Sequence, residues 1–282
     1  MNNRPKSEIL LSFFSECVQT FLSVIKILLQ SRQVEKPKKI CSNDEIVVLG
    51  NGPSLRPLIE TKGEFLKGKS LLAVNYAVLS DYYTTLKPDY YLVADPAFFF
   101  QPEHCNKLFD YLAAKTDWDL ELYLSVHARK STLWQSKLAD NPHIHIHYFN
   151  MTPIEGFRWF TDKAFRRGWG TPRPRNVLIP SIMMALRMPF HTIYVAGADH
   201  SWLKEIWVNE DNVVMEDLNH FYDKKGSERF VSDRHLHDLL LSMYIAFKSY
   251  HTIRAYADSI GKRIYNVTEG SYIDAFDRKK ID

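Results

Sequence analysis

The sequence predicts an α/β fold with a doubly wound, mostly parallel, Rossmann-like sheet. From residue 46 onwards, short apolar runs rich in Val, Ile, Leu and Tyr alternate with helical or loop segments, which is the pattern of βαβ units. The first run ends in a glycine-spaced turn, where open parallel sheets bring their backbone close to a ligand. The chain has 282 residues and is 45% hydrophobic, enough to bury one large core with a lid.

The elements follow from these runs in chain order. A strand at 143–148 alternates His and Ile, which suits a sheet with one solvated face. Helices are expected at 182–187 and 236–258, and the segment at about 200–234 is expected to form a mobile lid. The other expected strands cover residues 46–49, 71–74, 90–94, 120–125, 193–196 and 263–266.

The first 43 residues differ from the rest of the chain. Ile9 to Leu29 is dense in Leu, Ile, Phe and Val, but Glu16, Gln19 and Lys26 interrupt it. A spanning helix prefers about 20 residues with few or no charges, and no secretory cleavage site follows. We therefore expect residues 1–43 to form an amphipathic helix and a linker, and residues 44–282 to form the main domain.

This helix is too apolar to stand alone in water. Residues 8–39 carry basic side chains at Lys26, Arg32, Lys36, Lys38 and Lys39, so a peripheral contact with an anionic membrane surface is expected. The residues leave open the alternative that the helix packs on the body or on a second copy of the chain, which makes a homo-oligomer the competing expectation.

Composition excludes several classes of protein. The formal net charge is only +3, so the chain is not expected to bind nucleic acid. The three cysteines are scattered and odd in number, with no metal-ligand spacing. A reducing, cytoplasmic compartment therefore fits better than a disulfide framework.

The loop after the first strand is the strongest functional signal. Gly50, Asn51, Gly52 and Ser54 follow the apolar run directly. The glycines can adopt a positive φ and direct amide groups at an anion, and Ser54 can cap the next helix. The loop lacks both the third glycine of a dinucleotide fingerprint and the Lys of a phosphate-binding loop. A tight strand-to-helix connection is the alternative, and a nucleotide-binding turn is the preferred interpretation.

Polar residues also follow three other apolar runs. They are Asn75, Asp95 and Asp199. Because the carboxyl ends of parallel strands meet at one edge of a sheet, these side chains and the glycine loop are expected to share one crevice. An Asn amide offers donors and an acceptor to a nucleotide. The two Asp residues could hold ribose hydroxyls, loops or Mg²⁺, but no Asp-x-Asp pair compels a metal site.

Two further groups of polar residues each permit two interpretations. Arg173 and Arg175 lie in a basic, aromatic, Gly-containing stretch that suits an anionic ligand or a solvated loop. His143, His145 and His147 alternate along one strand, and an exposed sheet face is favoured over a metal trio.

The motifs in order resemble a known family. Gly50 to Leu55, Ile193 to Asp199 and Glu216 to Tyr222 are similar to motifs of the bacterial CMP-sialic acid sialyltransferases and of the related DUF115 and Maf-like glycosyltransferases. The resemblance covers about residues 46 to 275. It implies a GT-A-variant fold and a nucleotide-sugar donor site that includes Asn75.

The resemblance also implies roles for individual residues. His220 corresponds to the catalytic His of the family. The family has a Tyr that steadies the leaving phosphate where Ser201 stands. By their chemistry, Tyr222 could donate to that phosphate, and so could Arg173 or Arg175. Asn176 lies near the family's Ser-Gly pair, and Asp95 replaces an Asn, so the donor sugar or nucleotide can differ.

These observations lead to one expected activity and two alternatives. We expect a metal-independent, inverting glycosyltransferase, without a cofactor, that takes a CMP-linked nonulosonic or related acid sugar. Its acceptor is a surface glycan or glycolipid, and its place is the cytoplasmic face of the inner membrane. The alternatives are a Mg²⁺-dependent pyrophosphokinase of the DUF115 type and a nucleotide-binding accessory protein without turnover.

Overall fold

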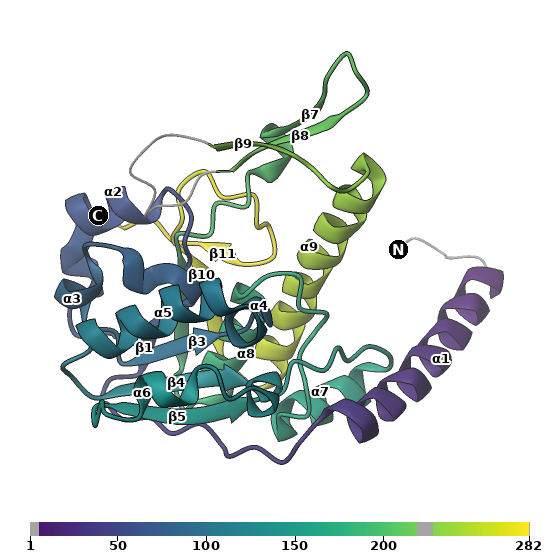
Figure 1. Cartoon of the computed structure of the whole chain (residues 1–282). Coiled ribbons are helices and arrows are strands. Elements are labelled where there is room, and N and C mark those ends of the chain that lie inside the picture. Colours follow the sequence, from purple (N-terminus) through teal and green to yellow (C-terminus); the bar gives the residue numbers. More distant parts are fainter. Residues whose placement is uncertain (1–5, 219–227, 282) are drawn as a thin grey trace.

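One parallel eight-stranded sheet organises the molecule, and helices cover both of its faces (Figure 1). The computed structural model describes residues 6–218 and 228–281, with the side chains of residues 6, 217–218 and 228–230 excepted. The strand order is β11-β10-β6-β1-β2-β3-β4-β5. The strands are β1 Glu45–Leu49, β2 Ser70–Val74, β3 Tyr90–Val93, β4 Leu120–Ser125, β5 Ile144–Phe149, β6 Thr192–Ala196, β10 Arg263–Asn266 and β11 Asp277–Arg278.

The chain reverses its direction of travel across the sheet between β1 and β6. From β1 it proceeds through β2, β3, β4 and β5 in one direction, and it then returns to place β6 on the other side of β1. This arrangement creates a topological switch point, where open α/β sheets hold their ligands at the carboxyl ends of the strands. The predicted doubly wound, mostly parallel sheet is therefore confirmed.

Strand side chains alternate between two separate cores, one on each face of the sheet. Helices α7, α8 and α9 pack on the face that carries Ile46, Val48 and Leu72. Helices α2, α3 and α5 cover the face that carries Val47 and Leu71. The helices are α1 Lys6–Gln30, α2 Leu55–Lys62, α3 Tyr83–Leu86, α4 Ala97–Phe100, α5 Pro102–Lys115, α6 Gln135–Leu138, α7 Arg158–Arg167, α8 Leu178–Arg187 and α9 Leu236–Ser259.

The predicted elements agree with the structure to within a few residues, with three differences. Helix α8 begins four residues earlier than expected, at Leu178. The short edge strand β11, Asp277–Arg278, was not expected. The described part of the predicted lid forms a small antiparallel sheet of β7 Ile206–Val208, β8 Val214–Leu218 and β9 Glu228–Val231. That it acts as a lid stays a prediction.

Helix α1 extends along one side of the molecule and projects beyond the body (purple in Figure 1). Its second half touches the body through polar side chains, and Ser23 is buried against Glu155. Most of its large apolar side chains are exposed. The expected N-terminal helix is present, and one stretch of it, Ser7–Gln30, is long and apolar enough to cross a membrane.

Candidate functional site at the topological switch point

The ends of four strands meet around one cavity of about 660 Å³. Asn51 follows β1, Asn75 follows β2, Asp95 follows β3, and Asp199 follows β6. The start of α8 supplies Asn176. The shared crevice predicted from the polar strand ends is therefore present in the structure. The predicted site residues that line the cavity are Asn51, Gly52, Asn75, Asp95, Arg175, Asn176, Asp199 and Ser201.

The two glycines of the first loop are required by close packing and not by a positive φ. Neither Gly50 nor Gly52 has a positive φ; the left-handed residue here is Gly197, with φ of 64°. A Cβ on Gly50 would lie 2.3 Å from the Gly197 carbonyl oxygen, and a Cβ on Gly52 would lie 1.9 Å from Asp199 Oδ2. The expectation of positive φ at these glycines is wrong, because the β6 loop presses directly on the β1 loop.

The amide groups of these glycines bond to protein. Gly50 N–H donates to the Ala196 carbonyl at 2.7 Å, and Gly52 N–H donates to the Gly197 carbonyl at 2.9 Å. The sequence suggested that these amides point outward at an anion, and the structure shows that they do not. Gly50 does not line the cavity and supports the loop from beneath.

Ser54 has a different role from the one predicted. It makes no side-chain cap for α2. Its hydroxyl instead donates to Asp199 Oδ2 at 2.8 Å, and its backbone N–H also bonds to that carboxylate. Burial raises the pKa of Asp199, while the two bonds from Ser54 act in the opposite direction. Ser54 lines a separate hollow beside α2 and the C-terminal strands and does not line the main cavity.

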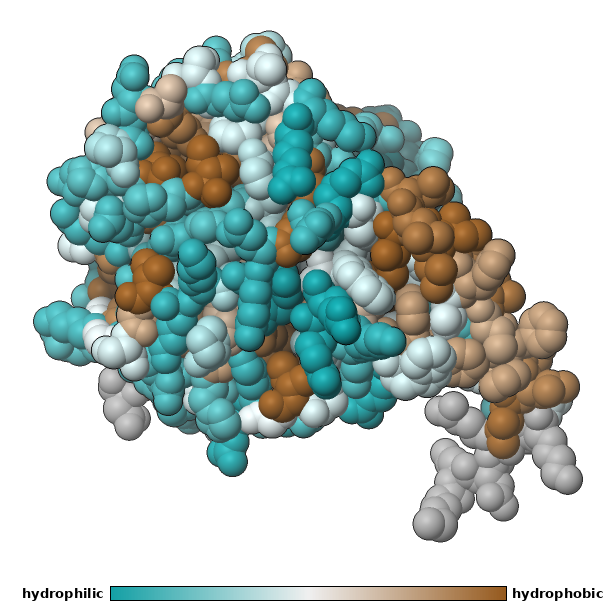
Figure 2. Space-filling model, turned by 90° about the horizontal axis from the view of Figure 1, so that it is seen from below, coloured by the Kyte–Doolittle hydropathy of each residue, from teal (hydrophilic) through white to brown (hydrophobic). Residues whose placement is uncertain are grey.

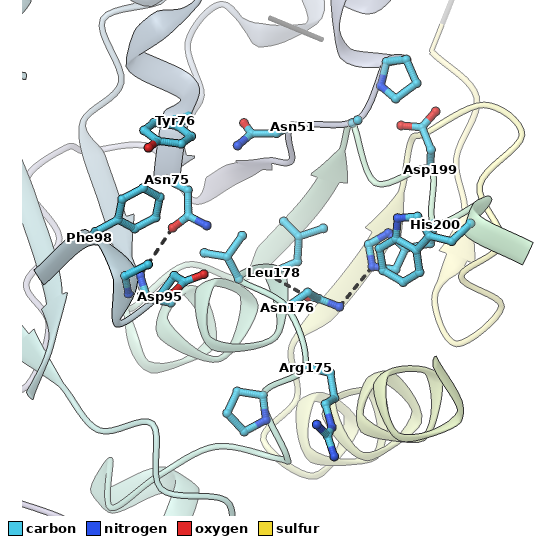
Figure 3. Close-up of a pocket in the computed structure, with 18 of the residues that line it drawn as sticks. Asn51, Asn75, Tyr76, Asp95, Phe98, Arg175, Asn176, Leu178, Asp199 and His200 are labelled. Carbon is cyan, nitrogen blue, oxygen red and sulfur yellow. Dashed lines mark hydrogen bonds between the residues drawn. The ribbon is translucent and has the colours of Figure 1, made fainter. Parts of the chain in front are cut away.

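His200 and Asn176 line the cavity (Figure 3), and both are hydrogen-bonded to the buried Tyr250. His200 Nε2 lies 2.7 Å from the Tyr250 hydroxyl and 3.3 Å from Asn176 Nδ2. Tyr250 also bonds to Asn176 Oδ1, at 3.0 Å. Burial lowers the pKa of His200 to about 3, so this imidazole is neutral near pH 7. A buried, bonded and weakly basic His is a poor general base and acts as a positioning residue.

Asn176 fixes the start of α8. Its Oδ1 accepts the N–H groups of Leu178 and Ile179, at 3.1 and 3.3 Å. This is the geometry of a helix N-cap, in which an Asn oxygen satisfies the first free amides of the helix. Of the predicted donor-binding residues, Asn176 is therefore largely committed to protein contacts.

The opposite side of the cavity is less fully bonded. Asn51 Nδ2 donates to the Val74 carbonyl at 3.2 Å, but its buried Oδ1 has no partner among the described residues. Asn75 has φ of 45°, and its Oδ1 makes one long contact of 3.5 Å with the Ala94 N–H. Asp95 caps the following turn through the Ala97 N–H at 2.9 Å and is exposed. A buried acceptor without a partner is costly, so Asn51 Oδ1 is suited to accept a hydrogen bond from a ligand in the cavity.

Aromatic side chains complete this side. Tyr76 and Phe98 meet edge to face, with ring centroids 4.8 Å apart, and the Tyr76 hydroxyl lies 2.7 Å from His104 Nδ1. Burial and the charges of Glu103 and Asp95 raise the pKa of Tyr76, so its hydroxyl keeps its proton. Figure 3 shows Asn75, Tyr76, Asp95 and Phe98 across the cavity from Asp199 and His200.

Sequence reasoning missed the aromatic residues of the cavity, which are Tyr76 and Phe98 on one side and Trp202, packed on His200, on the other. Tyr76 directly follows Asn75, and Phe98 and Trp202 each lie three residues after a predicted Asp. Proximity to strand ends was therefore a usable signal for these three. His104 comes from the first turn of α5, and no pattern in the sequence connects it to the crevice.

The remaining predicted residues lie at the margin or outside the described chain. Arg175 is exposed, and its side chain points away from both walls in Figure 3, toward a small hollow that also contains Glu216 and Arg234. Ser201 lines the cavity next to Trp202. His220 and Tyr222 fall outside the described residues.

The predicted solvated face of β5 is present. His143 lies 3.6 Å and His145 3.4 Å from Asp119, while His147 contacts Glu121. These histidines pair with carboxylates of the neighbouring strand β4 and of the segment that precedes it. Within the described residues, no group of three or more His, Cys, Asp or Glu side chains could hold a metal ion.

Comparisons with known proteins give a likeness among solved structures. No family model and no curated protein matches the chain. Among solved structures, the fold is similar to that of a Maf glycosyltransferase from Magnetospirillum magneticum AMB-1, with a TM-score of 0.49 and 11% sequence identity. The match covers 95% of this chain but only 38% of that one. Because the TM-score is below 0.5, we base no functional argument on this likeness.

Proposed function

We propose that the chain is an inverting glycosyltransferase that binds a nucleotide-activated sugar in the switch-point cavity. One observation carries the proposal: Asn51, Asn75 and the Tyr76–Phe98 wall leave a polar and aromatic surface exposed to a cavity of about 660 Å³. Amides suit ribose, base or phosphate groups, and aromatic rings suit bases and sugars. The motif resemblance extends the proposal to a CMP-linked acid sugar and to a surface glycan or glycolipid acceptor.

The proposed reaction is one direct displacement. The acceptor hydroxyl oxygen forms a bond to the anomeric carbon while the bond from that carbon to the phosphate oxygen breaks. The nucleotide leaves as an anion, and a base takes the hydroxyl proton. We propose His220 as this base, because its unperturbed pKa is near neutrality and the family motif includes it. Arg175 and Tyr222 are proposed to stabilise the leaving phosphate.

The walls of the cavity favour transfer over a metal-dependent reaction. Asp95 and Asp199 are the two carboxylates that a Mg²⁺-dependent pyrophosphokinase would use. They lie on opposite sides of the cavity (Figure 3), and Asp199 is engaged by Ser54. We place the reaction at the cytoplasmic face of the inner membrane, as the sequence suggests.

The experiment is a screen of nucleotide sugars for transfer, with analysis of the anomeric configuration of the product. We expect transfer from a CMP-linked acid sugar with inversion, in the presence of a metal chelator. His220→Ala should lower turnover by roughly 10²–10⁴-fold with donor affinity unchanged, because the base acts on the acceptor. His237→Ala, at an exposed His of α9, is the matched control. A strict requirement for ATP and Mg²⁺ would establish the pyrophosphokinase alternative, and nucleotide binding without turnover would establish the accessory protein.

A further inference from the structure

Polar side chains in the second half of α1 bond to the body, and most of the large apolar side chains of α1 are exposed. Thr20 Oγ1 accepts the Phe157 N–H at 3.0 Å, and Ser23 Oγ bonds to the backbone of Glu155 at 2.8 and 2.9 Å. Ser31, just after the helix, contacts Thr152 and the Trp169 carbonyl. This is the reverse of a helix on a water-soluble protein, which turns its apolar side to the core.

The polar residues occupy a single face. From Ser12 to Lys26, all polar side chains of α1 fall within an arc of about 140°, at about 100° per residue. The rest of the surface is apolar and exposed: Leu11 is 70%, Phe14 69% and Leu28 75% exposed. The exposed large hydrophobic residues of α1 are Ile9, Leu10, Leu11, Phe13, Phe14, Val18, Phe21, Leu22, Val24, Ile25, Leu28 and Leu29. Figure 2 shows them gathered along the projecting arm, in contrast to a largely hydrophilic body.

The apolar surface continues onto the body at one point. Phe13 packs on Phe157 with centroids 5.5 Å apart, and Phe157 stacks with Trp159 at 6.5 Å. Trp159, in the first turn of α7, is 68% exposed. An exposed Trp beside an apolar helix is typical of the membrane–water interface, where its ring and its N–H are both satisfied.

Exposed basic residues follow α1 in the chain and end α7, the helix that carries Trp159. Arg32, Lys36 and Lys38 are exposed in the segment that leaves α1, and Arg166 and Arg167 are exposed at the end of α7. Such a charge pattern attracts anionic lipid headgroups. It does not attract a second copy of the same basic chain. Charge therefore favours a membrane as the occupant of the apolar face.

The contacts with the body exclude a helix that spans the bilayer. From Thr20 onward α1 is hydrogen-bonded to backbone of the body, so only residues 6–19 lie before the first of these bonds. Fourteen helical residues cover about 21 Å at 1.5 Å each, less than the hydrocarbon thickness of about 30 Å. A spanning helix would draw the hydrogen-bonded loop at 152–157 into lipid, where unsatisfied backbone groups are costly.

We propose that α1 inserts in the plane of an anionic phospholipid membrane, with its apolar face in the acyl boundary, its polar face on the body, and Trp159 as a second contact. The inference does not rest on the proposed catalytic function. It differs from a loose surface contact because the helix is held in a fixed orientation, which sets how the body sits on the membrane.

The first test is sedimentation of the full chain with vesicles of phosphatidylcholine alone or with added phosphatidylglycerol. We expect binding to the anionic vesicles that weakens in high salt, because salt screens the basic residues. Leu11→Asp with Phe14→Asp should weaken binding by about tenfold or more, with the thermal unfolding midpoint unchanged because both side chains are exposed. Leu133→Asp, at an exposed Leu of the body, is the matched control and should bind as the parent does.

The second test separates in-plane insertion from spanning. Ser7→Cys places a thiol near the start of α1. Its labelling by a membrane-impermeant maleimide is measured in intact and in lysed bacterial spheroplasts, and the labelling of the parent chain is subtracted. We expect extra labelling only after lysis. Labelling in intact spheroplasts would overturn the proposal in favour of a spanning helix. Unchanged vesicle binding by the Leu11→Asp, Phe14→Asp chain would also overturn it. So would a parent chain that binds no vesicles and is a dimer in light scattering, if the two substitutions convert that dimer to a monomer.

Discussion

The two walls of the cavity differ in what their polar groups bond to. On the β1–β6 wall, Gly50, Gly52, Ser54 and Asp199 bond to one another or to nearby backbone, and His200 bonds to the side chains of Tyr250 and Asn176. On the other wall, Asn51 Oδ1, from the β1 loop, is buried without a partner in the described chain, and Asn75, after β2, makes one long bond. The glycines and Ser54 of the first loop therefore build the crevice, whereas Asn51 of the same loop and the residues after β2 and β3 are available to a ligand.

The largest effect is expected where the first wall is broken. Gly50→Val places its Cβ 2.3 Å from the Gly197 carbonyl oxygen, and neither backbone segment can yield cheaply. We expect the free energy of unfolding to fall by about 3 kcal/mol, measured by denaturant titration. Gly63→Ala is the control, because nothing lies within 4 Å of its added Cβ. Equal stability of the two variants would show that the loops do not pack as described.

A pH titration of stability tests the buried histidine on the same wall. The pKa of His200 falls to about 3 on burial, against about 6.5 when unfolded. The unfolded chain then binds the extra proton, so stability is retained above pH 6.5 and lost as the pH falls toward 3. His200→Gln should reduce this slope between those values by up to about 1.4 kcal/mol per pH unit.

The control for this titration is His237→Gln, because His237 is 79% exposed at the side chain. It should leave the slope unchanged. An identical pH dependence in the parent chain and His200→Gln would show that His200 is not buried in its neutral form.

A substitution in the wall that carries Asn75 and Tyr76 should lower ligand affinity with little change in the free energy of unfolding. Tyr76→Leu removes the ring that faces Phe98 and the hydroxyl that reaches His104. We expect nucleotide affinity to fall by a few-fold to about tenfold, since an aromatic contact contributes about 0.5–1.5 kcal/mol. Calorimetry with CMP measures the change, and Tyr111→Leu, at an exposed Tyr of α5, is the control. Unchanged affinity would remove Tyr76 from the binding surface.

The sheet and the crevice could be predicted from sequence because local signals agree there. Buried β-branched runs specify β1 and β6, and polar residues directly after the strands converge on one edge whatever the connecting loops do. The bonding within the crevice could not be predicted. The hydrogen bonds from Ser54 to Asp199 and from the Gly52 amide to Gly197 depend on how β6 lies beside β1. That strand pairing is long-range in the sequence.

The N-terminal helix shows again that long-range contacts could not be predicted from the local sequence pattern. Its amphipathic pattern was readable, but the pattern does not say which face meets the protein. The direction follows from partners such as Glu155 and Phe157, more than 130 positions along the chain from Thr20 and Ser23. These contacts turn a predicted surface helix into one held with its apolar side outward.

The difference between the two walls is tested most directly by the affinity of the chain for CMP after Asn75→Asp and after Ser54→Ala, measured by calorimetry. Asn75→Asp exchanges an amide donor for a carboxylate of the same size in the cavity, and Asn106→Asp adds the same charge on the exposed surface of α5. We predict that Asn75→Asp weakens CMP binding by about tenfold or more, while Ser54→Ala and Asn106→Asp leave it within about twofold. Loss of binding in Ser54→Ala with normal binding in Asn75→Asp would contradict this prediction and place the ligand on Ser54 and Asp199 instead.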